Sequence, residues 1–322
     1  MEKFSEKLKA ARKNAELSQT QLGAMIGVSQ HCMTNYERGI AIPRRSIVQK
    51  LADVLGVIPE YFMNDEIMEP YINLEHNNCI ENTWKRHGTF EGKVSVVTGG
   101  AHGIGKAITD AFRAEGAIVH IIDKESGDWF VGDVGDKKVL ERFSKYVIRQ
   151  SGHVDYVINN ALPIMKGINE CSYDEFNQAL AVGVTAPFYL TKLLMPHFAP
   201  GAVIINISSS RDRMSQPQTE SYTAAKGGVT ALTHALAVSL AGKVRVNSIS
   251  PGWINTKGIN ITKPDEQQQP VGRIGKPEDI AEMVLFLCSE KAGFITGENI
   301  CIDGGMTKLM VYHGEYGWEY RP

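Results

Sequence analysis

The sequence predicts an α/β fold with a doubly wound parallel sheet, preceded by a small all-α domain. Three patterns carry this prediction. Apolar residues recur at helical spacing, with capping residues between them, through roughly the first sixty positions. A β-rich run then leads into a glycine-rich loop and a helical pattern. A second β-rich run follows that helix, and this alternation is typical of a parallel sheet.

The length of the chain allows for two domains. Its 322 residues exceed one average domain. We expect an all-helical domain over 1–66, a linker over 67–89 and the α/β domain over 90–322. The linker stretch contains Asn, Glu and Gly without a clear period.

The composition is that of an ordinary globular protein, with 43% hydrophobic and 22% charged residues. No apolar run approaches the roughly 18 residues of a membrane span, and the first residues lack the apolar core of a secretory signal. We therefore expect a cytoplasmic protein without a membrane partner. The five cysteines form no CxxC pair, which argues against a disulfide framework and a zinc site, so no metal is expected.

Charge is distributed unevenly along the chain. The net charge is −2, yet residues 1–50 hold nine basic and four acidic side chains. From 51 to 90 the balance reverses. A basic first domain on a nearly neutral body suits a polyanionic partner for that domain alone.

Helix starts and stops are readable along the first domain. One helix face is outlined by Phe4, Leu8, Ala11 and Leu17. Ser18 then caps a helix that ends at Gly27, and Ser29 caps the next, which runs to Arg38. A fourth helix is outlined by Pro43, Ile47, Leu51 and Leu55. Pro59 begins a short fifth helix.

The stretch LSQTQLGAMIGVSQHCMTNYERG resembles the lambda-repressor or Cro-type helix-turn-helix family, and the resemblance covers the whole first domain. It implies that the second helix of the pair enters the major groove of double-stranded DNA. It also implies a structural ion pair between Arg12 and Glu37, with Met33 and Tyr36 facing the core.

The same resemblance assigns DNA contacts. Gln19 would meet a phosphate at a helix N-terminus, and Arg38 would contact the backbone together with Arg44 and Arg45. Base edges would be read by Gln30, His31, Thr34 and Asn35. The alternative is a helical bundle that contacts another protein. The turn glycine, the caps and the basic bias favour DNA over this alternative.

The second domain opens with a phosphate-binding pattern. The run Lys93–Val97 is β-rich and leads into a loop whose glycines, Gly99, Gly103 and Gly105, would let backbone amides approach a pyrophosphate at a helix N-terminus. Asp123 ends the next strand, about 20 residues on, where an acid binds ribose hydroxyls.

The spacing TGxxxGIG, with NNA at 159–161, SS at 208–209, YTAAK at 222–226 and PGWI at 251–254, resembles the short-chain dehydrogenase/reductase family over nearly all of 90–308. This implies a Rossmann sheet and a nicotinamide cofactor. The implied cofactor contacts are Gly99, His102, Gly103, Ile104, Gly105, Asp123, Asp133, Val134, Asn160, Tyr222, Lys226, Pro251, Gly252, Ile254 and Thr256.

The resemblance implies a catalytic set of Ser209, Tyr222 and Lys226. The tyrosine and lysine stand at i and i+4, on one helix face. We expect the lysine ammonium and the nicotinamide charge to lower the pKa of Tyr222. Tyr222 would exchange a proton with the substrate oxygen, Ser209 would hydrogen-bond that oxygen, and Lys226 would also hold the nicotinamide ribose.

Two positions depart from the family pattern. Gly183 stands where the family usually has an asparagine that completes a proton relay through water to the lysine. Either the relay is weakened or a water substitutes for the side chain. Leu162 replaces the last glycine of NNAG and narrows the space beside the nicotinamide. Both changes point towards slower turnover.

The cofactor preference leans to NAD over NADP, because Asp123 would repel a 2′-phosphate. Lys124 and His102 remain possible phosphate partners. The long tail after Gly305 is aromatic, with Tyr312, Tyr316, Trp318 and Tyr320. Packing at a subunit contact is favoured for it over a lid on a neighbouring active site.

Two functions fit these patterns. One is an NAD-dependent oxidoreductase that interconverts a secondary alcohol and a ketone and is fused to a sequence-specific DNA-binding module. The other is a transcriptional regulator whose dehydrogenase domain senses NAD(H) or a metabolite. The resemblances imply a homotetramer, or a homodimer that reads two-fold sites.

Overall fold

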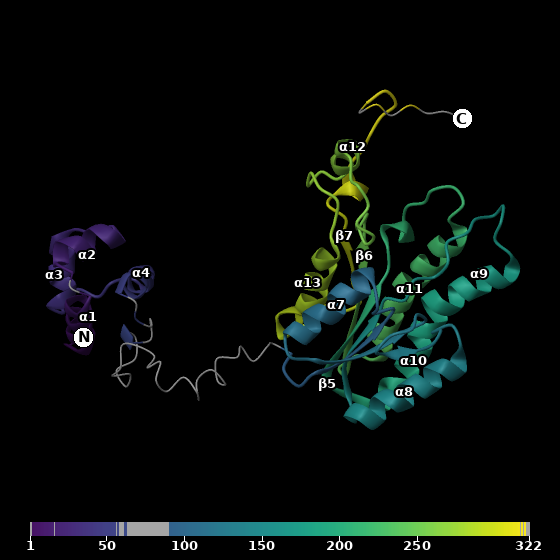
Figure 1. Ribbon diagram of the computed structural model, residues 1–322, viewed down its shortest axis with the longest axis horizontal. Helices are drawn as coiled ribbons and strands as arrows, with labels where there is room; N and C mark the ends of the chain where they lie inside the picture. The colour runs from purple at the N-terminus through teal and green to yellow at the C-terminus, as the bar shows by residue number, and fades with distance from the viewer. Residues whose placement is uncertain are drawn as a thin grey trace. The chain divides into compact units, whose positions relative to one another are not determined.

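The computed structural model describes residues 2–15, 17–55, 57, 61–62, 90–315, 317 and 319. These residues fall into two compact units, one within 1–85 and one within 86–322 (Figure 1). The expected linker lies outside the described residues. So do most of the expected fifth helix and three of the tail aromatics, Tyr316, Trp318 and Tyr320. Tyr312 is exposed.

The smaller unit is helical, as expected. Its helices are α1 (Glu2–Asn14), α2 (Gln19–Ile26), α3 (Gln30–Glu37) and α4 (Arg45–Leu55). The Ser18 side chain accepts from the amide of Gln21 in a capping box, and Gly27 ends α2 with a left-handed φ of 78°. Ser29 caps α3. The helices enclose one core that includes Leu8, Leu22, Ile26, Met33 and Leu51.

The larger unit is built on a parallel seven-stranded sheet in the order β3-β2-β1-β4-β5-β6-β7. Its strands are β1 (Val94–Thr98), β2 (Ile118–Asp123), β3 (Phe130–Val131), β4 (Val154–Asn159), β5 (Phe198–Ile207), β6 (Val244–Pro251) and β7 (Asn299–Ile302). The order reverses between β1 and β4. In such sheets ligands bind beyond the carboxyl ends of the strands at this reversal.

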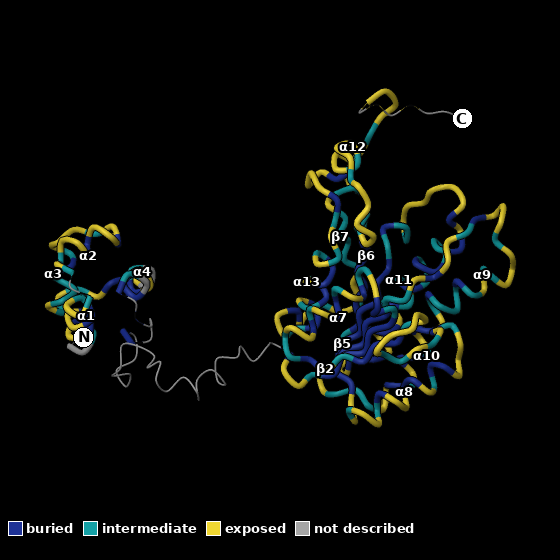
Figure 2. The backbone as a smooth tube through the Cα atoms, in the orientation of Figure 1, coloured by how far each residue is buried: buried dark blue, intermediate teal, exposed yellow. Residues whose placement is uncertain are grey.

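Helices cover both faces of the sheet. The helices of this unit are α7 (Gly103–Ala114), α8 (Lys137–Ser151), α9 (Tyr173–Leu180), α10 (Ala186–Leu194), α11 (Glu220–Ser239), α12 (Lys263–Gln267) and α13 (Pro277–Cys288), of which α12 has no buried residue. One apolar layer holds buried residues of α8, α10 and α11. The other holds buried residues of α7 and α13. Figure 2 shows the buried strands between these layers. This is the doubly wound Rossmann arrangement expected from the sequence.

A π-helical turn, η2 (Ala181–Thr185), joins α9 to α10. The helical run Tyr173–His197 is long and apolar enough to cross a membrane by length and composition alone. Its buried side chains, among them Ala186, Leu190 and Leu194, pack in the core beside the sheet. We therefore assign this run to the helices that pack one side on the sheet of the α/β fold.

Candidate functional site

The glycine loop after β1 is packed too tightly for side chains. A Cβ on Gly105 would lie 2.0 Å from the carbonyl oxygen of Gly99, and one on Gly99 would lie 2.9 Å from Cα of Ala161. Helix α7 starts at Gly103, and the His102 side chain makes no capping hydrogen bond there. The first amides of α7 are thus suited to an anionic ligand.

Asn160 and Thr98 hold this loop in place. Nδ2 of Asn160 donates to the carbonyl oxygens of Thr98, at 3.1 Å, and Gly99, at 2.8 Å. The Thr98 hydroxyl accepts from the amides of Asn160 and Ala161. Asn160 therefore shapes the cofactor loop through its own hydrogen bonds.

Asp123 lies at the end of β2 beside the loop. One carboxylate oxygen accepts from the amide of Ala101 at 3.1 Å, and the other from the amide of Glu125 at 3.1 Å. His102 hydrogen-bonds Glu125 at 2.9 Å and is exposed. These contacts fix the Asp123 carboxylate beside the glycine loop, and they give His102 an acidic partner.

A pocket of about 1,080 Å³ opens at the carboxyl ends of the strands. Its lining includes eight of the expected cofactor residues: Ile104, Asn160, Tyr222, Lys226, Pro251, Gly252, Ile254 and Thr256. Ser209 and Leu162 line the same pocket, and Leu162 is 73% exposed. The volume slightly exceeds the usual range for ligand pockets, so it has room for a dinucleotide with a small substrate. Together with the glycine cradle, this fits a nicotinamide cofactor.

The structure does not bring Asp133 and Val134 into this pocket. Val134 is buried in the core among α8 and the sheet. The Asp133 carboxylate accepts from the amide of Gly135 at 2.8 Å and from the Gln178 side chain at 3.2 Å. Both residues therefore shape the loop after β3, and their expected role in cofactor binding stays a prediction.

The surroundings that the protein itself provides raise the pKa of Tyr222, and the lowering expected from the lysine together with the nicotinamide charge stays a prediction. Burial raises this pKa, and a hydrogen bond from Ser209 and the charge of Arg211 only partly oppose this effect. The ammonium of Lys226 lies 5.5 Å from the centre of the Tyr222 ring. At this position the lysine does not offset the loss of solvation. The phenol is consequently held in its protonated form.

Lys226 is deeply buried. Its amine donates to the carbonyl oxygen of Ile207 at 2.7 Å. Burial lowers its pKa to about 8. A lysine ammonium has three donors, and this carbonyl takes one of them, which leaves others for a ligand in the pocket.

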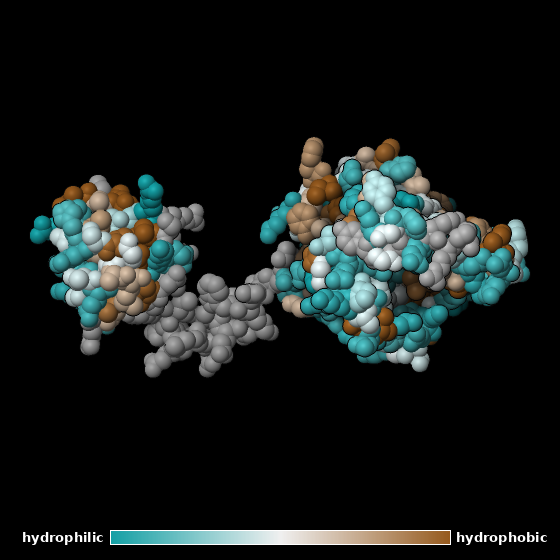
Figure 3. All heavy atoms as spheres, turned by 90° about the horizontal axis from the view of Figure 1, so that it is seen from above, coloured by the Kyte–Doolittle hydropathy of each residue, from teal (hydrophilic) through white to brown (hydrophobic). Residues whose placement is uncertain are grey.

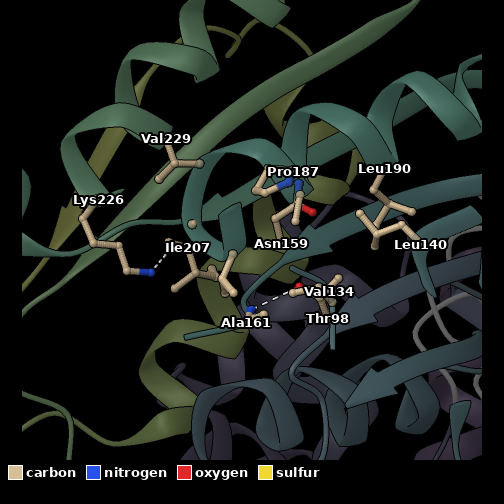
Figure 4. A pocket seen from close by; sticks show the side chains of 13 residues that line it. Thr98, Val134, Leu140, Asn159, Ala161, Pro187, Leu190, Ile207, Lys226 and Val229 are labelled. Atoms are coloured by element: carbon tan, nitrogen blue, oxygen red, sulfur yellow. Dashed lines mark hydrogen bonds between the residues drawn. The ribbon is translucent and has the colours of Figure 1, made fainter. Parts of the chain in front are cut away.

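A second, small cavity lies behind the lysine, between η2, α10 and the sheet (Figure 4). Its volume is about 10 Å³, close to what one water molecule requires. Gly183 and Lys226 both line it. A Cβ on Gly183 would lie 2.7 Å from Cβ of Ala225, so any side chain there would push η2 away from α11. The glycine is therefore needed for the close packing of these two elements.

In the smaller unit, a polar network ties α1, α2 and α3 together. The Arg12 guanidinium pairs with Glu37 at 2.5 Å and donates to the carbonyl oxygen of Leu17. Gln19 donates to Glu37 at 2.7 Å and accepts from Thr34 at 3.0 Å. The expected ion pair is thus present. The side chains of Gln19 and Thr34, both expected to contact DNA, form hydrogen bonds within the smaller unit.

The remaining expected DNA contacts lie at the surface of α3 and its end. Gln30, His31 and Arg38 are exposed, and Asn35 is half-buried. Met33, on the opposite side of α3, is fully buried, and Tyr36 is half-buried. The exposed side of α3 is therefore polar, as a groove-reading helix requires.

Sequence reasoning missed Arg211, which follows Ser209 by two positions and lines the large pocket. Nothing in the sequence separates it from an ordinary surface arginine, because the turn η4 (Ser210–Asp212) that aims it inward is too short to leave a periodic pattern. Among the residues described, no group of three or more His, Cys, Asp or Glu is placed to hold a metal.

The fold and the pocket define a class: a dinucleotide-dependent oxidoreductase preceded by a helix-turn-helix unit. Residues 99–307 match the sequence profile of a family described as enoyl-(acyl carrier protein) reductase, and residues 8–62 match a helix-turn-helix profile. The chain belongs to the short-chain dehydrogenase/reductase family, and its first domain is of the helix-turn-helix type.

Two curated relatives illustrate this membership. An uncharacterized oxidoreductase of Thermotoga maritima is 41% identical over 253 residues, which cover 69% of this chain and 99% of that protein. The L-fucose dehydrogenase of Mus musculus is 38% identical and covers 67% of this chain, with 89% of its own length matched.

Solved structures agree. An SCOR enzyme from Clostridium thermocellum is 42% identical, with a TM-score of 0.66, covering 72% of this chain and 99% of its own. The aldohexose dehydrogenase of Thermoplasma acidophilum is 26% identical, with a TM-score of 0.66, covering 71% and 99%. The larger unit is therefore an oxidoreductase domain of this family.

Proposed function

We propose that the chain is an NAD-dependent oxidoreductase that transfers a hydride between the nicotinamide and a secondary alcohol or ketone. The observation that carries this proposal is that Ser209, Tyr222 and Lys226 line one pocket with Asn160 and Thr256 from the cofactor side. Relatives named as dehydrogenases of L-fucose and aldohexose support a substrate with a CH–OH group.

Each catalytic residue then has a separate role. The cofactor, when bound, supplies or accepts the hydride. Tyr222, whose phenol is kept protonated by burial, donates its proton to the carbonyl oxygen during reduction and recovers it during oxidation. The Ser209 hydroxyl holds the same oxygen. Lys226 holds the nicotinamide ribose with the donors that the Ile207 carbonyl leaves over.

A turnover assay tests this proposal. The absorbance of NADH is followed with a panel of ketones in the wild type, Tyr222→Phe and the control Tyr173→Phe, which alters an exposed tyrosine. We expect turnover in the wild type and the control, and a loss of at least about a hundredfold in Tyr222→Phe. Equal turnover in Tyr222→Phe would contradict the assigned role.

The preference for NAD rests on Asp123. Its carboxylate is fixed by the Ala101 amide, so a 2′-phosphate would meet a negative charge at that site. One relative, a blue fluorescent protein from a metagenomic library, was solved in complex with NADPH, so the family offers both choices. We expect Asp123→Ser to lower the ratio of kcat/KM for NAD over NADP by about tenfold or more.

The first domain, we propose, binds double-stranded DNA as part of a dimer or tetramer in the cytoplasm. The exposed polar side of α3 and the basic balance of residues 1–50 support this role. An operator selected from random duplexes tests it. We expect Gln30→Ala and Asn35→Ala each to weaken operator binding by about tenfold or more, and the surface control Asn14→Ala to change nothing. Binding that ignores α3 substitutions would favour a protein-contact module.

The regulator reading remains a second candidate, because Gly183 removes the family's relay residue and Leu162 stands in the pocket. It requires the two activities to be coupled. In that case the DNA affinity of the full chain would differ between NAD, NADH and no ligand, since a ligand shifts only an equilibrium whose states it binds differently.

A further inference from the structure

Arg211 stands in the wall of the large pocket on the same side as the catalytic serine. It belongs to η4, the short turn that follows β5 and Ser209. The positive charge of Arg211 acts to lower the pKa of Tyr222, because it stabilises the ionised phenol. Arg211 and Tyr222 therefore line the same pocket, so one ligand in that pocket can be offered both side chains.

The partners of this guanidinium are neutral. One nitrogen donates to the Met165 sulfur at 3.2 Å, and another donates to the Gln216 side-chain oxygen. Within the described part of the chain, no carboxylate lies at ion-pair distance from Arg211. Neighbouring cations differ, since Lys166 pairs with Glu175 and Arg213 pairs with Asp212.

The lining of this pocket is mixed. Its apolar side chains include Leu162, Ile164, Met165, Met214 and Trp253, and they stand among serines, glutamines and three lysines. The one acid in the lining, Asp265, is occupied by the amide and hydroxyl of Thr262 at 2.9 and 2.6 Å. Figure 3 shows that hydrophilic residues cover much of the visible face of the larger unit.

We propose that Arg211 binds a carboxylate on the substrate, so that the preferred substrates are hydroxy acids and their oxo acids. An arginine fork matches the two oxygens of a carboxylate, and such charge-assisted hydrogen bonds are stronger than those between neutral groups. The apolar wall would hold the carbon chain between the two ends. This inference deepens the proposed dehydrogenase function and rests on it.

The chemistry balances without a further reactant. In oxidation, the C–H bond of the carbinol breaks and its hydride passes to NAD, while the hydroxyl proton passes to Tyr222, which has first released its own phenol proton to solvent. The C–O bond becomes a carbonyl, and the products are the oxo acid, NADH and one proton. The carboxylate on Arg211 takes no part in the electron transfer and only positions the carbinol.

A binding experiment on the full chain tests the inference separately from catalysis. The NADH-loaded protein is titrated by calorimetry with pyruvate, acetoacetate and levulinate, and with the methyl ester of each. The three acids place the ketone at increasing distance from the carboxylate. Variants are Arg211→Gln, Arg211→Lys and the control Arg149→Gln, which removes an exposed arginine on α8 outside the pocket.

We expect at least one acid to bind about tenfold or more tightly than its ester in the wild type and in Arg149→Gln. Arg211→Gln should abolish this preference without weakening the ester, and Arg211→Lys should restore part of it. Equal binding of acid and ester, no binding of any acid, or a preference that survives in Arg211→Gln would each overturn the inference.

The same samples separate this result from the dehydrogenase proposal. NADH consumption is read for every acid and ester. Turnover of esters as well as acids would leave the oxidoreductase intact and remove the role of Arg211. Arg211-dependent binding of an acid without any turnover would retain the anion site and count against hydride transfer.

Discussion

At the scale of single residues, burial decides the chemistry of the site. Tyr222 and Lys226 lie one helical turn apart, and the amine of Lys226 donates to the Ile207 carbonyl. The pKa of Lys226 is lowered, whereas the pKa of Tyr222 is raised. Both shifts disfavour the charged form, as expected where desolvation outweighs the nearby charges. The pair is therefore poised to supply a proton in the reducing direction.

The buried lysine makes stability depend on pH. Its folded-state pKa of about 8 lies below the ordinary 10.5. Between these values the unfolded chain binds more protons, so stability rises with pH. We expect the wild type to gain about 2 kcal/mol relative to Lys226→Met between pH 7.5 and pH 10, measured by urea unfolding.

The control for this measurement is Lys291→Met, which removes an exposed lysine. A difference between wild type and Lys226→Met that stays constant over that range would show that Lys226 is not buried as described.

Gly183 offers a second test at this scale. A methyl group there would lie 2.7 Å from Cβ of Ala225. We expect Gly183→Ala to destabilise the larger unit by roughly 1–3 kcal/mol through overpacking and to reduce turnover by shifting α11. Thermal unfolding and kcat are the measurements.

The double variant Gly183→Ala/Ala225→Gly removes the contacting methyl. It should recover most of the lost stability, apart from the intrinsic cost of a helical glycine. If the loss of unfolding free energy in the double variant equals the sum of the losses in the two single variants, the strain does not arise from the contact between Gly183 and Ala225.

At the scale of elements, the helix-turn-helix pair is fixed by its polar clamp. Burial opposes the ionisation of Glu37, but hydrogen bonds from Arg12 and Gln19 outweigh it and lower its pKa. The contribution of this carboxylate to stability is therefore present at neutral pH and lost as pH falls through the lowered value. The clamp joins α1, α2 and α3 at one point.

We expect Arg12→Met to destabilise the smaller unit by roughly 2–4 kcal/mol, because it removes the cationic partner of the Glu37 carboxylate and the side-chain donor to the Leu17 carbonyl, and leaves Glu37 with Gln19 alone. Hydrogen exchange of the full chain measures this locally. Amides of α2 and α3 should lose protection while those of the sheet keep it. The control Lys13→Met alters an exposed lysine and should leave the protection of these amides unchanged. The same unchanged protection in Arg12→Met would contradict a structural role for the ion pair between Arg12 and Glu37.

The elements were largely predictable because their signals are local. Ser18, Gly27 and Ser29 mark helix ends through their own hydrogen bonds and φ, and the glycine loop marks β1 and α7. Tyr222 and Lys226 are fixed by one helical turn. These features need no knowledge of distant parts of the chain.

What the sequence could not provide are properties that depend on residues far apart along the chain. The raised pKa of Tyr222 depends on the environment created by packing around α11. The burial of Val134 depends on how the loop after β3 meets α8. The contact between Gly183 and Ala225 depends on the approach of two helices, and the position of Arg211 depends on a short turn.

At the scale of the whole molecule, the question is whether the two domains act on each other. Coupling requires that cofactor and DNA favour a common state of the chain. If the regulator reading is right, NADH and NAD should give operator affinities that differ by about fivefold or more, measured by fluorescence anisotropy. Equal affinities would leave an enzyme with an independent DNA-binding domain.

The central claim is that Tyr222 and its neighbours carry out hydride transfer with a nicotinamide. The most direct test supplies NADH deuterated at the transferring position together with a ketone or oxo acid, and analyses the alcohol by mass spectrometry. We predict one deuterium on the carbinol carbon with the wild type, and none above background with Tyr222→Phe. An alcohol without deuterium, or equal labelling by Tyr222→Phe, would contradict the claim.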